Sequence, residues 1–123
     1  MGALGNMLHE QQAKEVVLVI ELNKDSWEEH IPNSSGWALV DFWSPKCVPC
    51  MNLMPDIKAL AEKYKDKLDF YSLDTTTARR LSMAQGVMSL PVIAFYHNGE
   101  KKHEFSGEFG AEDVEKKIQE IIG

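Results

Sequence analysis

Residues 37–43, WALVDFW, constrain the fold of this chain more than any other stretch. Every residue in the segment is apolar except Asp41. An apolar run of strand length is typical of a central strand that other parts of the protein cover on both faces. We therefore expect a sheet with 37–43 near its centre, flanked by helices, and Asp41 as an ionisable group inside the core.

Four further strands are predicted around this one. The β-branched run 16–20 predicts a buried strand, and 68–73 (LDFYSL) alternates as a strand does. Residues 92–96 and 101–105 flank His-Asn-Gly-Glu, in which Asn-Gly is a strong signal for a tight hairpin.

The helices are predicted from caps, breakers and apolar spacing. Apolar residues recur at three- and four-residue steps from 50 to 64, which predicts a helix that Pro55 should kink. A short helix is expected over Trp27 and Ile31, capped by Asp25 or Ser26 and followed by a loop at 32–36. A further helix is expected at 78–85, capped by Thr75, Thr76 or Thr77 and ended by Gly86. A closing helix should follow Gly110, and its apolar face should carry Val114, Ile118, Ile121 and Ile122.

The order of these elements predicts an α/β fold. Long crossovers make the first three strands parallel, and the hairpin adds an antiparallel edge, so we expect a mixed central β-sheet flanked by helices on both faces. The 123 residues suffice for one domain, at 16–123. Residues 1–15 are interpreted as an N-terminal extension, either a tail or a short helix.

Composition narrows the class of partner and the compartment. The formal charge is −6, and no long run of Lys or Arg occurs, so we expect no nucleic-acid or membrane partner. No apolar run is long enough to cross a bilayer, and residues 1–15 lack the basic start and apolar core of a secretory signal. We expect a cytoplasmic protein, in which a permanent structural disulfide would be unusual.

The chain has two cysteines, Cys47 and Cys50, in the stretch SPKCVPC that follows the central strand. The carboxyl end of a central strand is where such sheets bind and react with ligands. Cys47 should open the following helix, whose unpaired N–H groups favour a thiolate there, and Lys46 should add a modest effect. Cys50 lies one helical turn further on, and Pro49 stiffens that turn without losing a hydrogen bond.

Three other interpretations of the cysteines compete with a reactive pair. They could be small apolar core residues, but Lys46 and the prolines around Cys47 favour exposure. They could bind zinc, but that usually takes four ligands, and the four histidines are scattered. A structural disulfide is disfavoured by the expected compartment. We therefore predict an exchanging dithiol pair, with no bound cofactor and no metal.

The chain resembles the thioredoxin family. The residues concerned are LVDFWSPKCVPC, a helix with Pro55, then SLPV and a strand, NGE and Gly107, and the likeness covers about residues 16–123. It implies a thioredoxin fold. It also implies that Cys47 is the attacking thiolate and Cys50 the resolving thiol, that Asp41 relays a proton beneath Cys50, and that Pro91 lies in a cis-proline loop opposite the disulfide.

The resemblance also suggests a client-binding surface. Trp43 is expected beside the disulfide, and Leu90 should present backbone groups to an extended client peptide. With Lys46 and Val48 the chain departs from the usual Trp-Cys-Gly-Pro-Cys, so we expect an altered groove around Pro49. Ser72 stands where a lysine commonly neighbours the aspartate. The absence of that lysine should raise the pKa of Asp41, in the same direction as burial of this carboxyl group.

We therefore expect a cytosolic thiol-disulfide oxidoreductase that reduces protein disulfides through Cys47 and Cys50. By the resemblance, a thioredoxin-reductase-like flavoenzyme would recycle it, and the protein would act as a monomer. The CVPC core and TTTARRLSMAQGVMSLP are similar to thioredoxins of anaerobic glycine, sarcosine and betaine reductase systems. Two alternatives stay open: an oxidant or isomerase of the same fold, and a non-catalytic binding module.

Overall fold

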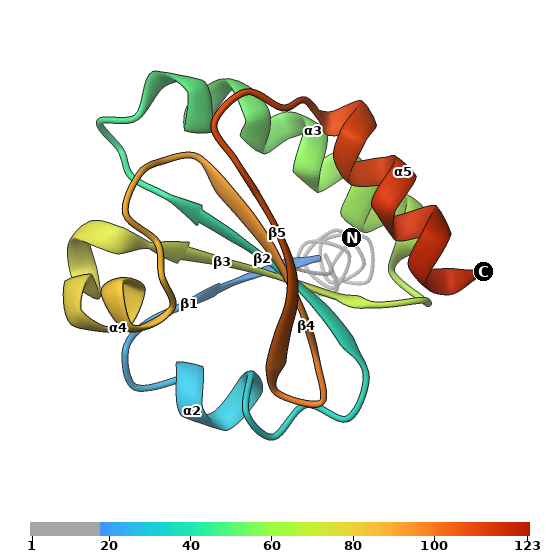
Figure 1. Cartoon of the computed structure of the whole chain (residues 1–123), viewed down its shortest axis with the longest axis horizontal. Helices are drawn as coiled ribbons and strands as arrows, with labels where there is room; N and C mark the ends of the chain where they lie inside the picture. The colour runs from blue at the N-terminus through green and yellow to red at the C-terminus, as the bar shows by residue number, and fades with distance from the viewer. Residues whose placement is uncertain (1–17) are drawn as a thin grey trace, which may run out of the picture.

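The computed structural model describes residues 18–123 as a five-stranded sheet with helices on both faces (Figure 1). The strand order is β1-β3-β2-β4-β5. The elements are β1 (Val19–Leu22), α2 (Trp27–His30), β2 (Trp37–Trp43), α3 (Val48–Tyr64), β3 (Asp69–Asp74), the 3-10 turn η1 (Thr75–Thr77), α4 (Arg79–Ala84), β4 (Val92–His97), β5 (Glu100–Ser106) and α5 (Ala111–Ile122).

The predicted mixed topology is confirmed. Strands β1, β3 and β2 run parallel, whereas β4 is antiparallel to β2 and β5 is antiparallel to β4. The β4–β5 hairpin turns at Asn98 and Gly99, both with positive φ, as the Asn-Gly signal predicts. Strand β2 is thus the middle strand, with a partner on each side.

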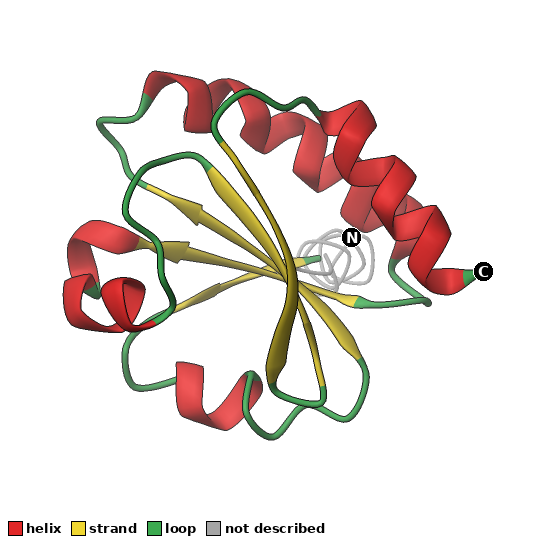
Figure 2. Cartoon of the chain, viewed as in Figure 1, coloured by secondary structure: helices red, strands yellow, loops and turns green. Residues whose placement is uncertain are grey.

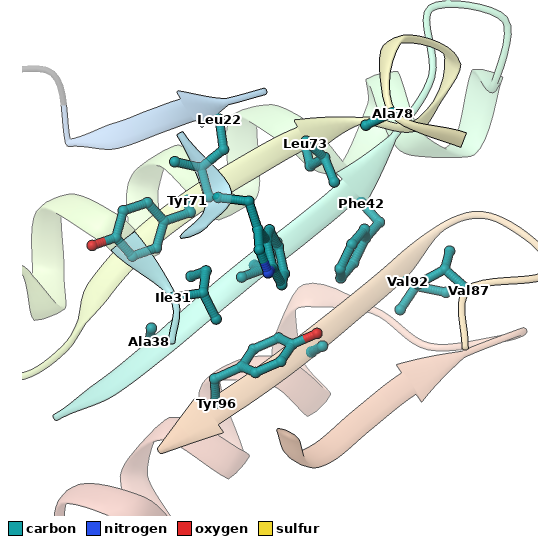
Figure 3. Close-up of a cluster of buried hydrophobic side chains, with 13 residues drawn as sticks. Leu22, Ile31, Ala38, Phe42, Tyr71, Leu73, Ala78, Val87, Val92 and Tyr96 are labelled. Atoms are coloured by element: carbon teal, nitrogen blue, oxygen red, sulfur yellow. The ribbon is translucent and has the colours of Figure 1, made fainter. Parts of the chain in front are cut away.

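The alternation of side chains along β2 divides the core into two layers. Ala38, Val40 and Phe42 point to the face that α2 and α4 cover, where Trp27 packs 5.6 Å from Tyr96 between ring centroids (Figures 2 and 3). Leu39 points to the opposite face and packs among residues of α3 and α5. Because Asp41 lies two residues after Leu39, it also faces α3.

Some expectations about the first and last elements were wrong. The first strand ends at Leu22 rather than at residue 20, and it is an edge strand with Ile20 40% exposed, because only β3 pairs with it. The expectations for residues 1–15 and for the strand start at Val16 lie outside the described residues. In α5, Val114 and Ile118 are buried as predicted, but Ile122 is 37% exposed at the chain end.

The segment between β3 and α4 also differs from the prediction. The three threonines do not cap a helix but form η1, whose own N-cap is Asp74, and Ala78 precedes α4. The Asp74 carboxylate accepts a hydrogen bond from the Thr76 N–H at 2.9 Å. An aspartate competes well for such backbone donors, so the turn starts one residue earlier than the threonines suggest. Gly86 has positive φ after α4, as predicted.

Candidate active site

A tight turn connects β2 to α3 and places both cysteines at the helix start. The Cys47 N–H donates to the Ser44 carbonyl at 3.1 Å, and the Lys46 N–H donates to the Ser44 hydroxyl at the same distance. Pro49 lies in the first turn of α3, where its missing N–H would have no helical partner. The turn and the proline are both encoded locally, in the consecutive residues SPKCVPC.

Cys47 is the N-cap of α3 and is joined to Cys50 by a disulfide, with the two Cα atoms 5.2 Å apart. The Cys50 N–H donates to the Cys47 Sγ at 3.2 Å. A helix N-terminus carries unpaired N–H donors and partial positive charge, so it stabilises negative charge on this sulfur after reduction. The predicted orientation of the helix end toward Cys47 is therefore confirmed.

The two sulfur-bearing residues differ in exposure. Cys50 is completely buried, whereas Cys47 is only partly buried. Lys46, Val48 and Pro49 around them are exposed, with Val48 68% accessible. A large partner can therefore reach Cys47 first, whereas the buried Cys50 is not accessible to it.

The loop before β4 reaches the same end of the sheet. Phe42 pairs with Val92, so Trp43 and Pro91, the next residues outward, lie side by side where the two strands leave the sheet. The Leu90–Pro91 peptide bond is cis, as the resemblance implies, and both residues are half-buried. Figure 1 shows this loop beside the segment between β2 and α3. Backbone groups of the loop are thus near the disulfide-bearing turn.

Asp41 lies within the core on the α3 side of β2. It is only 1% exposed, and its Oδ1 has no hydrogen-bond partner among residues 18–123. Burial and, as the smaller cause, the negative charge of Glu21 together raise the pKa of Asp41 from 3.8 to about 7. The predicted direction is confirmed, and the group can both accept and release a proton near neutral pH.

Glu21 is a site residue that the sequence interpretation missed. The Trp43 indole Nε1–H donates to both oxygens of its carboxylate, at 3.2 and 3.3 Å, and the Ser72 hydroxyl also donates to it. The predicted first strand ended at residue 20, which left Glu21 outside it. Glu21 lies two residues after Val19, so the two side chains share one face of a strand that is otherwise apolar. This pattern was the sequence signal that could have identified Glu21.

Three exposed methionines were also missed. Met51 is 44% exposed in the first turns of α3, Met83 is 62% exposed on α4, and Met88 is 79% exposed in the loop before Leu90. Together with Val48, they lie on the segments that lead to the disulfide or to Pro91. Exposed methionines adapt to partners of different shape, which is useful on a surface that contacts many proteins.

Metal-ligating clusters and membrane-spanning helices are both missing from the described part of the chain. No group of three or more His, Cys, Asp or Glu side chains that could hold a metal ion occurs within residues 18–123. Over the same residues, no helix has the length and apolar character needed to cross a membrane. The absence of a cofactor and of a metal stays a prediction.

The chain is similar in sequence to known proteins. The family model described as thioredoxin matches residues 18–120. A thioredoxin of Acetoanaerobium sticklandii is 42% identical over 105 residues, which cover 85% of this chain and all of that protein. A thioredoxin of Peptoclostridium acidaminophilum is 36% identical over 107 residues, covering 86% of this chain and 97% of that one.

A solved structure has the same fold. A mutant thioredoxin from Halobacterium salinarum, which differs from its parent protein by one substitution, superposes with a TM-score of 0.76. The superposition covers 85% of this chain and 90% of that one, at 21% sequence identity. At that identity the match supports the fold alone. The five-stranded mixed sheet with helices on both faces is thus shared with a solved thioredoxin.

Proposed function

We propose that Cys47 and Cys50 perform thiol-disulfide exchange in this protein. The premise is that the chain belongs to the thioredoxin family and is a thiol-disulfide oxidoreductase with protein-disulfide reductase activity. One observation supports this assignment best. The Cys50 N–H points at the Sγ of the accessible Cys47, while Cys50 itself is buried. The accessible sulfur is the one that the helix end favours as a thiolate.

The reaction follows in two exchange steps. In the reduced protein the Cys47 thiolate attacks one sulfur of a client disulfide, the client S–S bond breaks, and the other client sulfur leaves as a thiolate. Cys50 then loses its proton and attacks the Cys47 sulfur of the mixed disulfide, releasing the second client sulfur. Two electrons have passed to the client, and Cys47 and Cys50 are joined by the disulfide seen here.

Asp41 is proposed to accept the proton of Cys50 in the second step and to return it when the disulfide is reduced again. Asp41 faces α3, in whose first turn Cys50 lies, and both residues are buried. A general base works best when its pKa lies near the working pH, and the pKa of Asp41, raised to about 7 mainly by burial, meets this condition.

The client is proposed to bind over the disulfide and the cis-proline loop. Trp43, Lys46, Val48 and Pro49 come from the β2–α3 segment, and Leu90 and Pro91 come from the loop before β4. An extended client peptide would pair with the backbone beside Leu90, and the exposed apolar residues Met51, Met83 and Met88 would enlarge the contact.

The partners and the compartment are proposed on the resemblance. Disulfide-containing proteins are the general substrate class of the family. A thioredoxin-reductase-like flavoenzyme would supply electrons, and a glycine, sarcosine or betaine reductase complex would be one recipient, as the CVPC core suggests. The protein would act in the cytoplasm as a monomer.

The proposed roles are tested by exchanging each cysteine separately. Cys47→Ser should abolish reduction of insulin disulfides, measured by turbidity with dithiothreitol as electron donor. Cys50→Ser should instead accumulate a covalent mixed disulfide with insulin, visible on a non-reducing gel, because the resolving thiol is missing. Cys47→Ser with full activity, or trapping by Cys47→Ser instead of Cys50→Ser, would reverse the roles.

The oxidant and adaptor alternatives are separated by two measurements on the unaltered protein. A reduction potential from glutathione equilibration near that of strong oxidants would favour the oxidant or isomerase. The absence of any acceleration over dithiothreitol alone would favour a binding module. Acceleration together with a low potential would support the reductant.

A further inference from the structure

Three polar side chains form one row across the parallel half of the sheet. Glu21 on β1 is paired with Ser72 on β3, and Ser72 is paired with Asp41 on β2. Residues paired laterally in a sheet point to the same face, so all three side chains face α3. With neighbouring strands about 4.7 to 4.9 Å apart, the Cα atoms of Glu21 and Asp41 are about 10 Å apart.

The side chain of Glu21 is held toward this row rather than released into solvent. The Trp43 indole N–H and the Ser72 hydroxyl both donate to its carboxylate. A side chain on an exposed edge strand normally samples several rotamers, so two donors from two different strands restrict it considerably. The negative charge therefore has a defined position on the edge of the site.

Glu21 and Asp41 both line one cavity of about 190 Å³ under α3. Glu21 is exposed to solvent, whereas Asp41 is only 1% exposed. The other charged group facing this cavity is Lys58 of α3, and Ser72, Trp43, Val19, Met54 and Ile57 complete its lining. On its other side, Asp41 is paired with Ile93 of β4, which is apolar. In α3, Cys50 forms the disulfide with Cys47.

We propose that Glu21 is a positioning residue for proton transfer: held by Trp43 and Ser72, its carboxylate favours the protonated form of Asp41 and so makes Asp41 a stronger acceptor for the Cys50 proton. This inference rests on the proposed role of Asp41. A fixed like charge across the cavity disfavours a second negative charge on Asp41, and solvent at the exposed Glu21 and the positive charge of Lys58 keep this effect smaller than that of burial. The burial of Asp41 and the charge of Glu21 raise the pKa of Asp41 together, with burial the larger cause.

The proton balance of the exchange is unchanged by Glu21. The Cys50 proton passes to the Asp41 carboxylate, Asp41 becomes a neutral acid, and Glu21 takes no part in the transfer. What Glu21 changes is the pH at which Asp41 is half protonated, and hence the pH at which the second exchange step is half-maximal.

The test changes the charge at residue 21. Glu21→Gln keeps the shape and one acceptor oxygen for Trp43 and Ser72, and Glu21→Lys reverses the charge. The titration of the Asp41 side-chain carboxyl carbon is followed by ¹³C NMR in the oxidised full-length protein. We expect its midpoint to fall by about half a unit in Glu21→Gln and by about twice that in Glu21→Lys. Glu28→Gln on α2, which removes an equal charge outside the lining of this cavity, should leave the midpoint unchanged.

A second readout follows proton transfer itself. In the reduced protein, Cys47 attacks the symmetrical disulfide of thionitrobenzoate, which releases one thionitrobenzoate and leaves the other joined to Cys47 as a mixed disulfide. Cys50 then attacks the Cys47 sulfur and releases this second chromophore in a single turnover. The midpoint of this rate against pH should fall in Glu21→Gln by the same amount as the Asp41 titration. Folding of each variant is checked by circular dichroism, and Glu28→Gln again serves as the matched control.

The outcomes separate the two proposals. An Asp41 midpoint that stays unchanged or rises in both Glu21 variants would overturn the role of Glu21, while the proton role of Asp41 would stand. If the Asp41 midpoint shifts but chromophore release in the parent and in Asp41→Asn has the same pH dependence, the proton role proposed for Asp41 is wrong and the inference falls with it. If the Asp41 titration and the pH midpoint of chromophore release shift by the same amount, the roles proposed for Asp41 and Glu21 are both supported.

Discussion

The two halves of the site, the sulfur-bearing entrance of α3 and the polar row of Glu21, Ser72 and Asp41 behind it, are built in different ways. The entrance comes from consecutive residues, and its key hydrogen bond joins Cys50 to Cys47 over three positions. The row joins Glu21, Asp41 and Ser72, which are brought together only when three strands align. The entrance is partly exposed, whereas Asp41 is fully enclosed.

This difference determines how strongly a charge acts in each half. Near the exposed Lys46, water and salt screen an added or removed charge within about 10 Å. Around Asp41, burial itself is the main cause of a raised pKa, and a neighbouring charge adds to it. We therefore propose that the entrance sets which sulfur reacts and that the row sets the pH at which the proton moves. The predictions below test that division, from the largest expected effect to the smallest.

Asp41→Asn should remove most of the pH dependence of stability that the row creates. Between about pH 4 and pH 7 the folded protein retains a proton on Asp41 that the unfolded chain has released, because the pKa of Asp41 is raised from 3.8 to about 7. The free energy of unfolding of the parent protein should therefore fall over this range as pH rises, by on the order of 4 kcal/mol, and level off above it. Asp41→Asn should lack this fall and be the more stable protein at pH 8.

Urea unfolding at several pH values measures this effect. Asp56→Asn on the exposed side of α3 is the matched control and should keep the slope of the parent protein. Equal slopes in Asp41→Asn and the parent would mean that Asp41 is ionised in the folded protein at all these pH values.

Alkylation should separate the two sulfurs of the entrance. In the reduced protein at pH 7, iodoacetamide should modify Cys47 at least about tenfold faster than Cys50, because Cys47 is accessible and lies at the helix N-terminus, and Cys50 is buried. Mass spectrometry of the digested protein gives both rates. A faster reaction at Cys50, or no reaction at Cys47, would contradict the assignment on which the exchange mechanism depends.

Lys46→Gln should have the smallest effect. Lys46 is exposed beside Cys47, so loss of its charge should slow alkylation of Cys47 by less than about twofold at low salt, and the difference should vanish near about 0.5 M salt. Lys102→Gln on β5 provides a control of equal charge. A large, salt-independent loss in Lys46→Gln would show that the entrance is less screened than its exposure indicates.

Local sequence signals were sufficient for much of this molecule. The apolar run at 37–43, the apolar spacing over α3 and the Asn98–Gly99 turn predicted a central strand, a long helix and a hairpin, and all three are present. The spacing of Cys47 and Cys50 at a helix start predicted an exchanging pair. In the helix, the turn and the cysteine pair, the stabilising interactions join residues near one another in the chain. The strand pairs with residues 69–74 and 92–97 instead, and its apolar run alone identified it.

The family resemblance placed Ser72 beside Asp41, as the structure has it, but only the tertiary structure added Glu21 to the surroundings of Asp41. Asp41 is separated from Glu21 by 20 positions in the sequence and from Ser72 by 31. Nothing in the local sequence of β1 specifies the strand with which β1 pairs. Pairing with β3 placed a carboxylate of an edge strand in the same row as the buried acid. The physical reason is that charges interact through space, so the pKa of a buried acid depends on neighbours that only chain folding selects.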